Sequence, residues 1–203
     1  MSADAERTSR GEGAAGRDGA AREARVVRRI VLSGTESTGK TQLAQRLAAH
    51  FGEPWAAEYA REYWDAHGGI AAGDLDAIGR GQVANEEAAA ARARRVVFCD
   101  TDLITCVLWN DLLFPGHCPA WVRAAADERA RGVALYLLCD ADVPWVPDPQ
   151  RCFPDEAGRE RSRRLWREAL VSRGLPVVEI RGGWAERERA AIAAVGEAVN
   201  GKL

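Results

Sequence analysis

The stretch Ser-Gly-Thr-Glu-Ser-Thr-Gly-Lys-Thr-Gln at residues 33–42 constrains the fold of this 203-residue chain more than any other feature. Its spacing, Gly34 followed by four residues and then Gly39-Lys40-Thr41, lets a loop turn backbone N–H groups toward an anion while the lysine reaches the outer phosphates. An apolar run precedes the stretch, and apolar residues at helical intervals follow it. The order strand, loop, helix places the anion at a helix N-terminus, where unpaired N–H groups favour negative charge. The sequence therefore predicts a phosphate-binding loop rather than an ordinary glycine turn.

Lysine is almost absent from the chain, and this makes Lys40 informative. Of 28 basic residues only two are lysine, Lys40 and Lys202. A lysine kept where the composition otherwise uses arginine indicates a site that admits a compact ammonium but no planar guanidinium. We therefore predict that Lys40 is a catalytic residue. The expected nucleotide-binding set is Gly34, Thr35, Glu36, Ser37, Thr38, Gly39, Lys40, Thr41 and Gln42.

Apolar strands and amphipathic helices alternate along the chain from residue 26 onward. Strands are expected near residues 28–33, 54–57, 94–99, 133–139 and 175–180, with helices between them and a last helix at 185–199. This alternation predicts one α/β domain, residues 26–203, with a parallel sheet that carries helices on both faces and binds ligands at the carboxyl ends of its strands. Residues 2–25 contain no Val, Leu, Ile, Phe, Tyr or Trp. We therefore expect residues 1–25 to form a disordered leader.

Charge and composition exclude several classes of partner. The net charge of −2 and the isoelectric point near 6.0 give no basic field for nucleic acid or for an anionic membrane. No apolar run approaches the roughly 20 residues that span a bilayer, and the N-terminus lacks the apolar core of a secretory signal. We expect a cytoplasmic protein that acts on a small molecule, and the sequence carries no signal for a particular oligomeric state. The five cysteines form no Cys-x-x-Cys pair, so buried free thiols are expected rather than a zinc site.

Carboxylates are expected beside the phosphate-binding loop, because two strands of the predicted sheet end on polar residues. Asp100 directly follows an apolar strand, where a nucleotide-bound Mg²⁺ is held, with the Thr41 hydroxyl as a direct ligand. The alternative is that Asp100 caps the following helix, with Asp102 in its first turn. Glu58 and Arg61 lie about one helical turn apart, so the carboxylate could accept a proton from a substrate hydroxyl and the arginine could bind a phosphate. The alternative for this pair is an ordinary surface ion pair.

A segment rich in proline and arginine, residues 141–164, is expected to form a lid over the bound phosphates. We expect one or two of its arginines to reach the nucleotide while the rest lie on a solvated helix face. The candidates are Arg151, Arg159, Arg161, Arg163 and Arg164. Most tryptophans are expected in the core. Trp109 and Trp145 are the exceptions, because they flank the expected acceptor cleft and an aromatic face binds a flat cationic ring.

Four stretches, GTESTGKT, EYAREY, CDTDLITC and DADVPWVPDPQR, together resemble the ribosylnicotinamide kinase domain of the NadR family over about residues 29–199. The resemblance implies a P-loop NTPase fold like that of nucleoside monophosphate kinases, with a lid. It also implies that ATP and Mg²⁺ serve to phosphorylate the ribosyl hydroxyl of nicotinamide riboside, which gives nicotinamide mononucleotide. It places Asp100 and Asp102 near the metal and the ribose, and Asp148 in the lid.

The predicted site combines these assignments. The catalytic set is Lys40, Glu58, Asp100 and Arg151, and the metal ligands are Thr41 and Asp100. The substrate-binding set is Glu58, Arg61, Asp102, Trp109, Trp145 and Asp148. Two rival functions stay open: a kinase for another small molecule or nucleoside, and a nucleotide-binding regulatory switch that phosphorylates nothing. Formation of ADP that depends on an acceptor separates a kinase from a switch.

Overall fold

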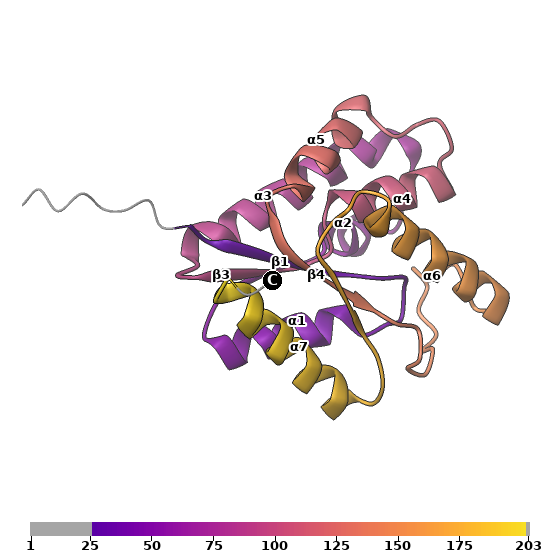
Figure 1. Cartoon of the computed structure of the whole chain (residues 1–203). Helices are drawn as coiled ribbons and strands as arrows, with labels where there is room; N and C mark the ends of the chain where they lie inside the picture. The colour runs from indigo at the N-terminus through magenta and orange to yellow at the C-terminus, as the bar shows by residue number, and fades with distance from the viewer. Residues whose placement is uncertain (1–25, 202–203) are drawn as a thin grey trace, which may run out of the picture.

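A five-stranded parallel sheet organises the computed structural model, which describes residues 26–201 (Figure 1). The spatial order of its strands is β2-β3-β1-β4-β5, and every pairing is parallel. Their bounds are β1 Arg28–Ser33, β2 Trp55–Ala56, β3 Val96–Asp100, β4 Val133–Cys139 and β5 Val177–Ile180. The expected leader, residues 1–25, lies outside the described residues, as do residues 202–203. The α/β architecture predicted from the alternating pattern is confirmed.

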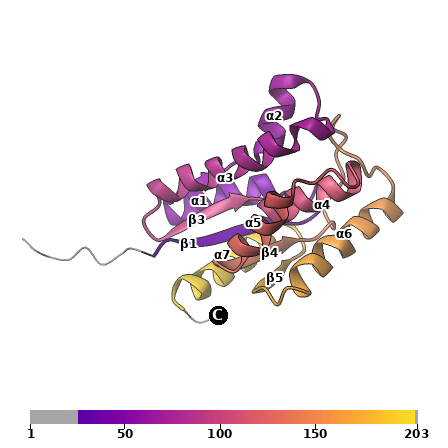
Figure 2. The same cartoon turned by 90° about the horizontal axis from the view of Figure 1, so that it is seen from above.

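Helices cover both faces of this sheet. Figures 1 and 2 show α1 and α7 on one face and α3, α4, α5 and α6 on the other. The bounds are α1 Lys40–Phe51, α2 Tyr59–His67, a 3₁₀ turn Ala72–Asp74, α3 Leu75–Arg92, α4 Leu103–Leu113, α5 Ala120–Ala130, α6 Glu156–Val171 and α7 Trp184–Val199. None of these described helices is long and apolar enough to cross a membrane. Because the strands are parallel, their carboxyl ends meet at one edge of the sheet.

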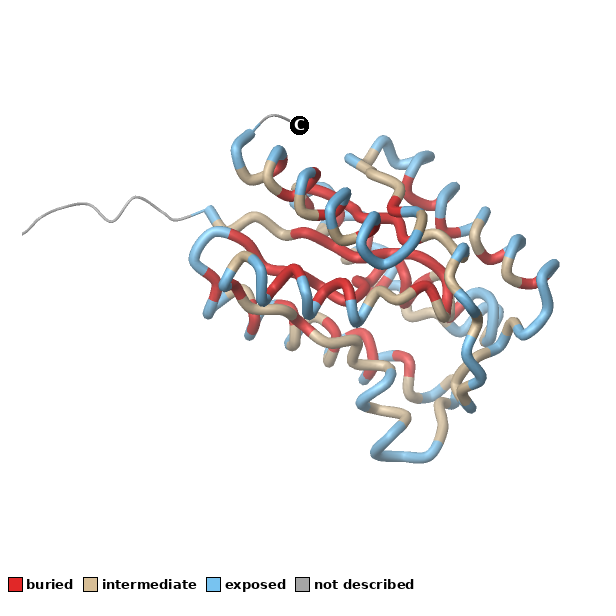
Figure 3. The backbone as a smooth tube through the Cα atoms, turned by 90° about the horizontal axis from the view of Figure 1, so that it is seen from below, coloured by how far each residue is buried: buried red, intermediate tan, exposed pale blue. Residues whose placement is uncertain are grey.

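The strands are buried on both faces, because adjacent side chains of a strand point to opposite sides of the sheet. In β1, Val31 packs in the cluster that contains Trp166 of α6, whereas Ile30 and Leu32 pack in the cluster that contains Leu43 of α1. Figure 3 shows buried residues along the strands and exposed residues on the outer turns of the helices. Because the buried residues determine where each strand ends, they also place the polar residues that follow the strands at one edge of the sheet.

The segment predicted as a lid divides into two parts. Residues 141–155, called the strap below, contain no helix or strand. The chain becomes helical at Glu156, and Asp155 caps this helix by accepting a hydrogen bond from the N–H of Gly158 at 2.8 Å. Gly158 and Ser162 are buried, so this first part of α6 is packed against the body of the domain. The segment predicted as a lid, residues 141–164, therefore comprises the strap and the first part of α6.

Glu53 joins the turn before β2 to the start of β3. Its side chain is buried, and its two carboxylate oxygens accept hydrogen bonds from the backbone N–H groups of Arg94 at 2.7 Å and Arg95 at 3.1 Å. We expect Glu53→Ala to lower the free energy of unfolding by about 1–3 kcal/mol, because both donors lose their partner. Urea unfolding followed by circular dichroism measures this loss. Glu87→Ala, at a side chain that is 63% exposed, is the control and should change the free energy by less than about 1 kcal/mol; equal effects of the two substitutions would contradict the prediction.

Candidate active site

The phosphate-binding loop, residues 34–39, crosses the carboxyl edge of the sheet between β1 and α1. Gly34 has a φ of 135°, and a Cβ there would lie 2.6 Å from the carbonyl oxygen of Cys139 at the end of β4. Gly39 has a φ of 79° and lies against the ring of Trp184, so a side chain at this position would collide with the ring. Both the backbone conformation and the close approach therefore require glycine at the two ends of the loop.

Arg187 of α7 binds the backbone of the loop. The residue is 1% exposed and donates hydrogen bonds to the carbonyl oxygens of Thr38 at 3.0 Å, Gly182 at 2.9 Å and Asp140 at 2.8 Å. One buried guanidinium thus ties the loop to the segments that follow β4 and β5. The sequence analysis did not identify Arg187, because an arginine among the charged residues of an amphipathic helix carries no local signal.

Lys40, Thr41 and Asp100 form a polar cluster directly beyond the loop. The Lys40 ammonium donates to the carbonyl oxygen of Thr35 at 2.8 Å, and the Thr41 hydroxyl donates to Oδ2 of Asp100 at 2.5 Å. Asp100 is 1% exposed, and its Oδ1 has no hydrogen-bond partner. Burial raises the pKa of Asp100, while the Lys40 ammonium and the Thr41 hydroxyl oppose the rise. An unpartnered carboxylate oxygen beside a hydroxyl offers the oxygen ligands that Mg²⁺ takes, so the residues fit the predicted metal role.

Glu58 and Arg61 bring a second pair of charges to the same place. Glu58 immediately precedes α2, Arg61 lies in its first turn, and both line the cavity described below. Burial raises the pKa of Glu58 and the charge of Asp100 raises it further, whereas Lys40 and Arg61 oppose the rise. Gln82 of α3 accepts a hydrogen bond from the N–H of the first residue of α2 at 3.0 Å. This contact, which the sequence analysis did not identify, fixes the start of the helix beside Glu58.

Asp102 does not join the polar cluster. Its Oδ1 accepts a hydrogen bond from the N–H of Thr105 at 3.3 Å, so it caps α4, and its Oδ2 accepts one from the Tyr136 hydroxyl at 2.7 Å in the core. Burial raises the pKa of Asp102 to about 6. The helix cap considered for Asp100 therefore belongs to Asp102, which was predicted to bind substrate but does not line the cavity. Thr101 and Thr105 line the cavity instead.

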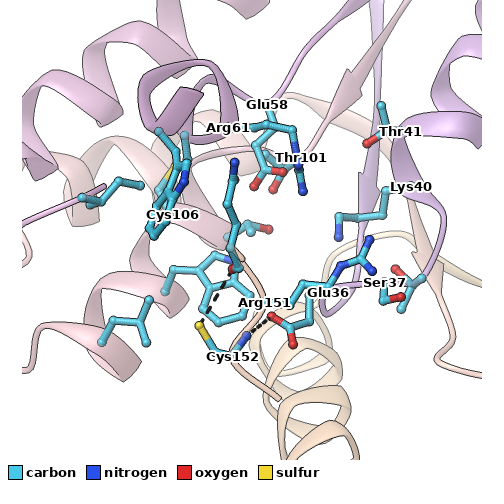
Figure 4. A pocket seen from close by; sticks show the side chains of 18 of the residues that line it. Glu36, Ser37, Lys40, Thr41, Glu58, Arg61, Thr101, Cys106, Arg151 and Cys152 are labelled. Atoms are coloured by element: carbon cyan, nitrogen blue, oxygen red, sulfur yellow. Dashed lines mark hydrogen bonds between the residues drawn. The ribbon is translucent and has the colours of Figure 1, made fainter. Parts of the chain in front are cut away.

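One cavity of about 820 Å³ extends from the loop to the surfaces of three helices (Figure 4). Near the loop it is lined by Lys40, Thr41, Glu58 and Arg61. Its other walls include apolar side chains of α2, α3, α4 and the adjoining turns, namely Trp64, Ile70, Leu75, Ile78, Leu113 and Phe114. A charged end beside apolar walls suits a ligand that carries phosphates or hydroxyls at one end and a flat ring at the other.

The strap crosses from the loop to α2. On the α2 side, Asp148 pairs with Arg61 at 3.2 Å, and the Gln150 side-chain amide donates to Asp65 at 3.0 Å. Arg151 lines the cavity, and its Nη1 is buried without a hydrogen-bond partner. Of the five arginines predicted as candidates for the nucleotide, Arg151 is the one that reaches the cavity wall.

Trp109 and Trp145 have different surroundings. Trp109 lines the cavity and stacks on Phe153 of the strap, with the ring centroids 5.8 Å apart. Trp145 is absent from the cavity lining, and the guanidinium of Arg151 lies 6.0 Å from its ring centroid. The structure therefore brings Trp109 into the predicted acceptor cleft. Trp145 and Asp148, which were predicted to bind substrate, make their contacts within the strap or with α2 and do not line the cavity.

A family model described as an AAA domain matches residues 29–187. The chain belongs to the AAA domain family. Two curated relatives of this AAA domain are the trifunctional NAD biosynthesis/regulator proteins NadR of Escherichia coli, 30% identical over 159 residues, and of Salmonella typhimurium, 29% identical over 160 residues. Each match covers 76% of this chain but 38% of the relative, so the chain spans less than half the length of these relatives.

Solved structures of NadR resemble this AAA domain in fold. A NadR structure in complex with NR has a TM-score of 0.67 at 25% identity and covers 86% of this chain and 52% of that chain. A second, in complex with NAD and AMP-PNP, has a TM-score of 0.65 at 25% identity and covers 86% of this chain and 50% of that chain. A shikimate kinase from Acinetobacter baumannii, with a TM-score of 0.53 and 15% identity over 88% of this chain and 97% of that chain, shares the fold alone. The resemblance to NadR that the motifs indicate is confirmed.

Proposed function

We propose that this AAA domain is a kinase that transfers the γ-phosphoryl group of ATP to the ribosyl hydroxyl of nicotinamide riboside and so forms nicotinamide mononucleotide. The observation that carries the proposal is a single cavity in which Lys40 of the phosphate-binding loop, the carboxylate of Glu58 and apolar walls face the same space. The relatives support it, because NadR is named for NAD biosynthesis and has been solved with NR and with AMP-PNP.

Each charged residue of the cavity has a separate role in the proposed phosphoryl transfer. Glu58 accepts a hydrogen bond from the acceptor hydroxyl and takes its proton as the oxygen attacks the γ-phosphorus, while the bond from that phosphorus to the bridging oxygen breaks and ADP leaves. A raised pKa makes Glu58 a stronger base for this proton. Lys40 and Arg151 supply cationic groups that stabilise the negative charge of the transferring group. Thr41 and Asp100 would hold Mg²⁺, which neutralises phosphate charge when it is bound.

The apolar part of the cavity suits the ring of the acceptor. Trp64 and Trp109 supply aromatic surface there. Nicotinamide riboside carries a cationic pyridinium ring, and attraction between a cation and an aromatic face contributes about 0.5–2 kcal/mol. Neutral nucleosides lack this contribution and should be poorer substrates.

The test is to incubate the protein with MgATP and one acceptor at a time and to detect the phosphorylated product by mass spectrometry. The acceptors are nicotinamide riboside, nicotinic acid riboside, uridine, cytidine, adenosine and thymidine. Nicotinamide riboside is expected to give the highest kcat/KM. Faster turnover of a neutral nucleoside would indicate a kinase with another acceptor. ATP binding without acceptor-dependent formation of ADP would indicate a regulatory switch.

Trp109→Ala is expected to reduce the preference for nicotinamide riboside over uridine by about 2- to 30-fold, which is the equivalent of the lost cation–π attraction. The measurement is the ratio of kcat/KM for the two acceptors. Trp145→Ala is the matched control, since its ring does not line the cavity and its loss should leave this ratio unchanged. An unchanged ratio in Trp109→Ala would remove Trp109 from the acceptor site.

A further inference from the structure

Both carboxylate oxygens of Glu36, in the phosphate-binding loop, accept hydrogen bonds from the backbone of the strap. Figure 4 shows the one from Cys152. Its Oε2 accepts a hydrogen bond from the N–H of Cys152 at 2.7 Å, and its Oε1 accepts one from the N–H of Phe153 at 2.6 Å. The residue is 9% exposed. Hydrogen bonds to an ionised carboxylate are about twice as strong as those between neutral groups. Two backbone N–H groups of the strap therefore supply a hydrogen-bond partner for each oxygen of the Glu36 carboxylate.

The two residues that flank Glu36 also form hydrogen bonds with the strap and with α6. The Ser37 hydroxyl accepts a hydrogen bond from the N–H of Val146 at 3.1 Å, and the Thr35 hydroxyl bonds to the Ser162 hydroxyl of α6. Each of these contacts is a single hydrogen bond between neutral groups. Glu36 contributes two charge-assisted hydrogen bonds and is the main attachment among the three.

Arg151 is the residue immediately before the backbone groups that Glu36 binds. Its side chain lines the cavity, and its buried Nη1 has no hydrogen-bond partner. Its own N–H donates to the carbonyl oxygen of Asp148 at 3.0 Å, and the Asp148 carboxylate pairs with Arg61 of α2 at 3.2 Å. The backbone around Arg151 is thus bound at two points. Glu36 binds it to the loop, and the ion pair between Asp148 and Arg61 binds it to α2.

We propose that Glu36 is a positioning residue, which fastens the strap to the loop and thereby sets the Arg151 guanidinium beside the transferring phosphate. Glu36 also lines the cavity, and this role adds to its predicted contact with the nucleotide, which stays a prediction. The positioning role requires a carboxylate, because a glutamine has one accepting oxygen and would present its NH₂ group to the second backbone N–H. The part that Arg151 plays in transfer rests on the proposed kinase function, whereas the fastening of the strap does not.

Limited trypsin digestion of the full chain tests the fastening without any acceptor. The peptide bond after Arg151 contains the N–H that Glu36 binds, so cleavage requires local release of the strap. Glu36→Gln is expected to accelerate cleavage at this bond by about 10-fold or more, measured by mass spectrometry. Glu160→Gln, at an exposed carboxylate of α6, is the matched control and should leave the rate unchanged. An unchanged rate in Glu36→Gln, or an equal acceleration at all arginyl bonds through global unfolding, would overturn the proposal.

A double-mutant cycle between Glu36→Gln and Arg151→Ala tests the positioning. Glu36→Gln alone is expected to lower kcat by about 10-fold with the KM for ATP changed by less than about 3-fold. In the Arg151→Ala background the same substitution should lower kcat by less than about 2-fold, because Glu36 acts through Arg151. If the two substitutions lower kcat independently, so that their effects multiply in the double variant, this part of the proposal is overturned. If the wild-type protein phosphorylates no acceptor, the proposed function fails, and the digestion still decides whether Glu36 fastens the strap.

Discussion

Replacing Lys40 by arginine is expected to lower kcat/KM for phosphoryl transfer by about 10²- to 10³-fold, nearly as much as replacing it by alanine. The Lys40 ammonium lies against the loop backbone, 2.8 Å from the carbonyl oxygen of Thr35. A compact ammonium can move from this carbonyl to a phosphate within the loop, whereas a planar guanidinium fork is too wide for the same path. Charge alone therefore does not preserve activity.

Steady-state kinetics with MgATP and the preferred acceptor measure the loss in Lys40→Arg and Lys40→Ala. Arg92→Lys, at an exposed side chain near the end of α3 that does not line the cavity, makes the reverse exchange and serves as the control with unchanged kcat/KM. If Lys40→Arg keeps most of the activity, the inference drawn from the scarcity of lysine is wrong.

Glu58→Gln is expected to lower kcat by about 10²- to 10⁴-fold while the affinity for ATP stays intact. The substitution keeps the shape of the side chain but removes its capacity to accept the proton of the acceptor hydroxyl. Because Glu58 lies beside Asp100 and Lys40 without a hydrogen bond to the loop, the nucleotide-binding conformation should survive. Single-turnover formation of product and titration with AMP-PNP measure the two quantities separately.

Asp100→Asn is the matched comparison for Glu58→Gln, since both exchanges replace a carboxylate by an amide in the same cluster. The Asp100 carboxylate accepts the hydrogen bond of the Thr41 hydroxyl. We expect the concentration of Mg²⁺ that gives half-maximal rate to rise by about 10- to 100-fold in Asp100→Asn and to stay unchanged in Glu58→Gln. Equal effects of the two substitutions on nucleotide affinity and on Mg²⁺ dependence would refute this division of roles.

The parts of the site that depend on neighbours in sequence could be predicted from sequence alone. The spacing of Gly34 and Gly39 between a strand and a helix predicts the loop, and the end of an apolar run places Asp100 at the edge of the sheet. Parallel strands bring their carboxyl ends together, so Glu58 and Asp100 could be assigned to one place without knowledge of their side-chain directions.

Side-chain directions that depend on distant segments could not be predicted in this way. Asp102 lies two residues beyond Asp100, yet its carboxylate turns into the core because the Tyr136 hydroxyl of β4 offers a buried partner. The strap has no helical or strand period, so nothing local indicates that Arg151 lines the cavity while Trp145 does not. The partners of Glu36 lie 116 and 117 residues later in the chain, beyond the reach of any local pattern.

The attachment of Glu36 to main-chain groups has a consequence for how the sequence can drift during evolution. Since its partner at position 152 is a backbone N–H, almost any side chain can replace the exposed Cys152 without loss of the bond. Proline is the exception, because it has no N–H to donate. We therefore expect homologous chains to retain an acidic residue at position 36, while this hydrogen bond excludes only proline at position 152. A contact of this kind produces no correlated substitutions, so methods that infer contacts from covariation should overlook it.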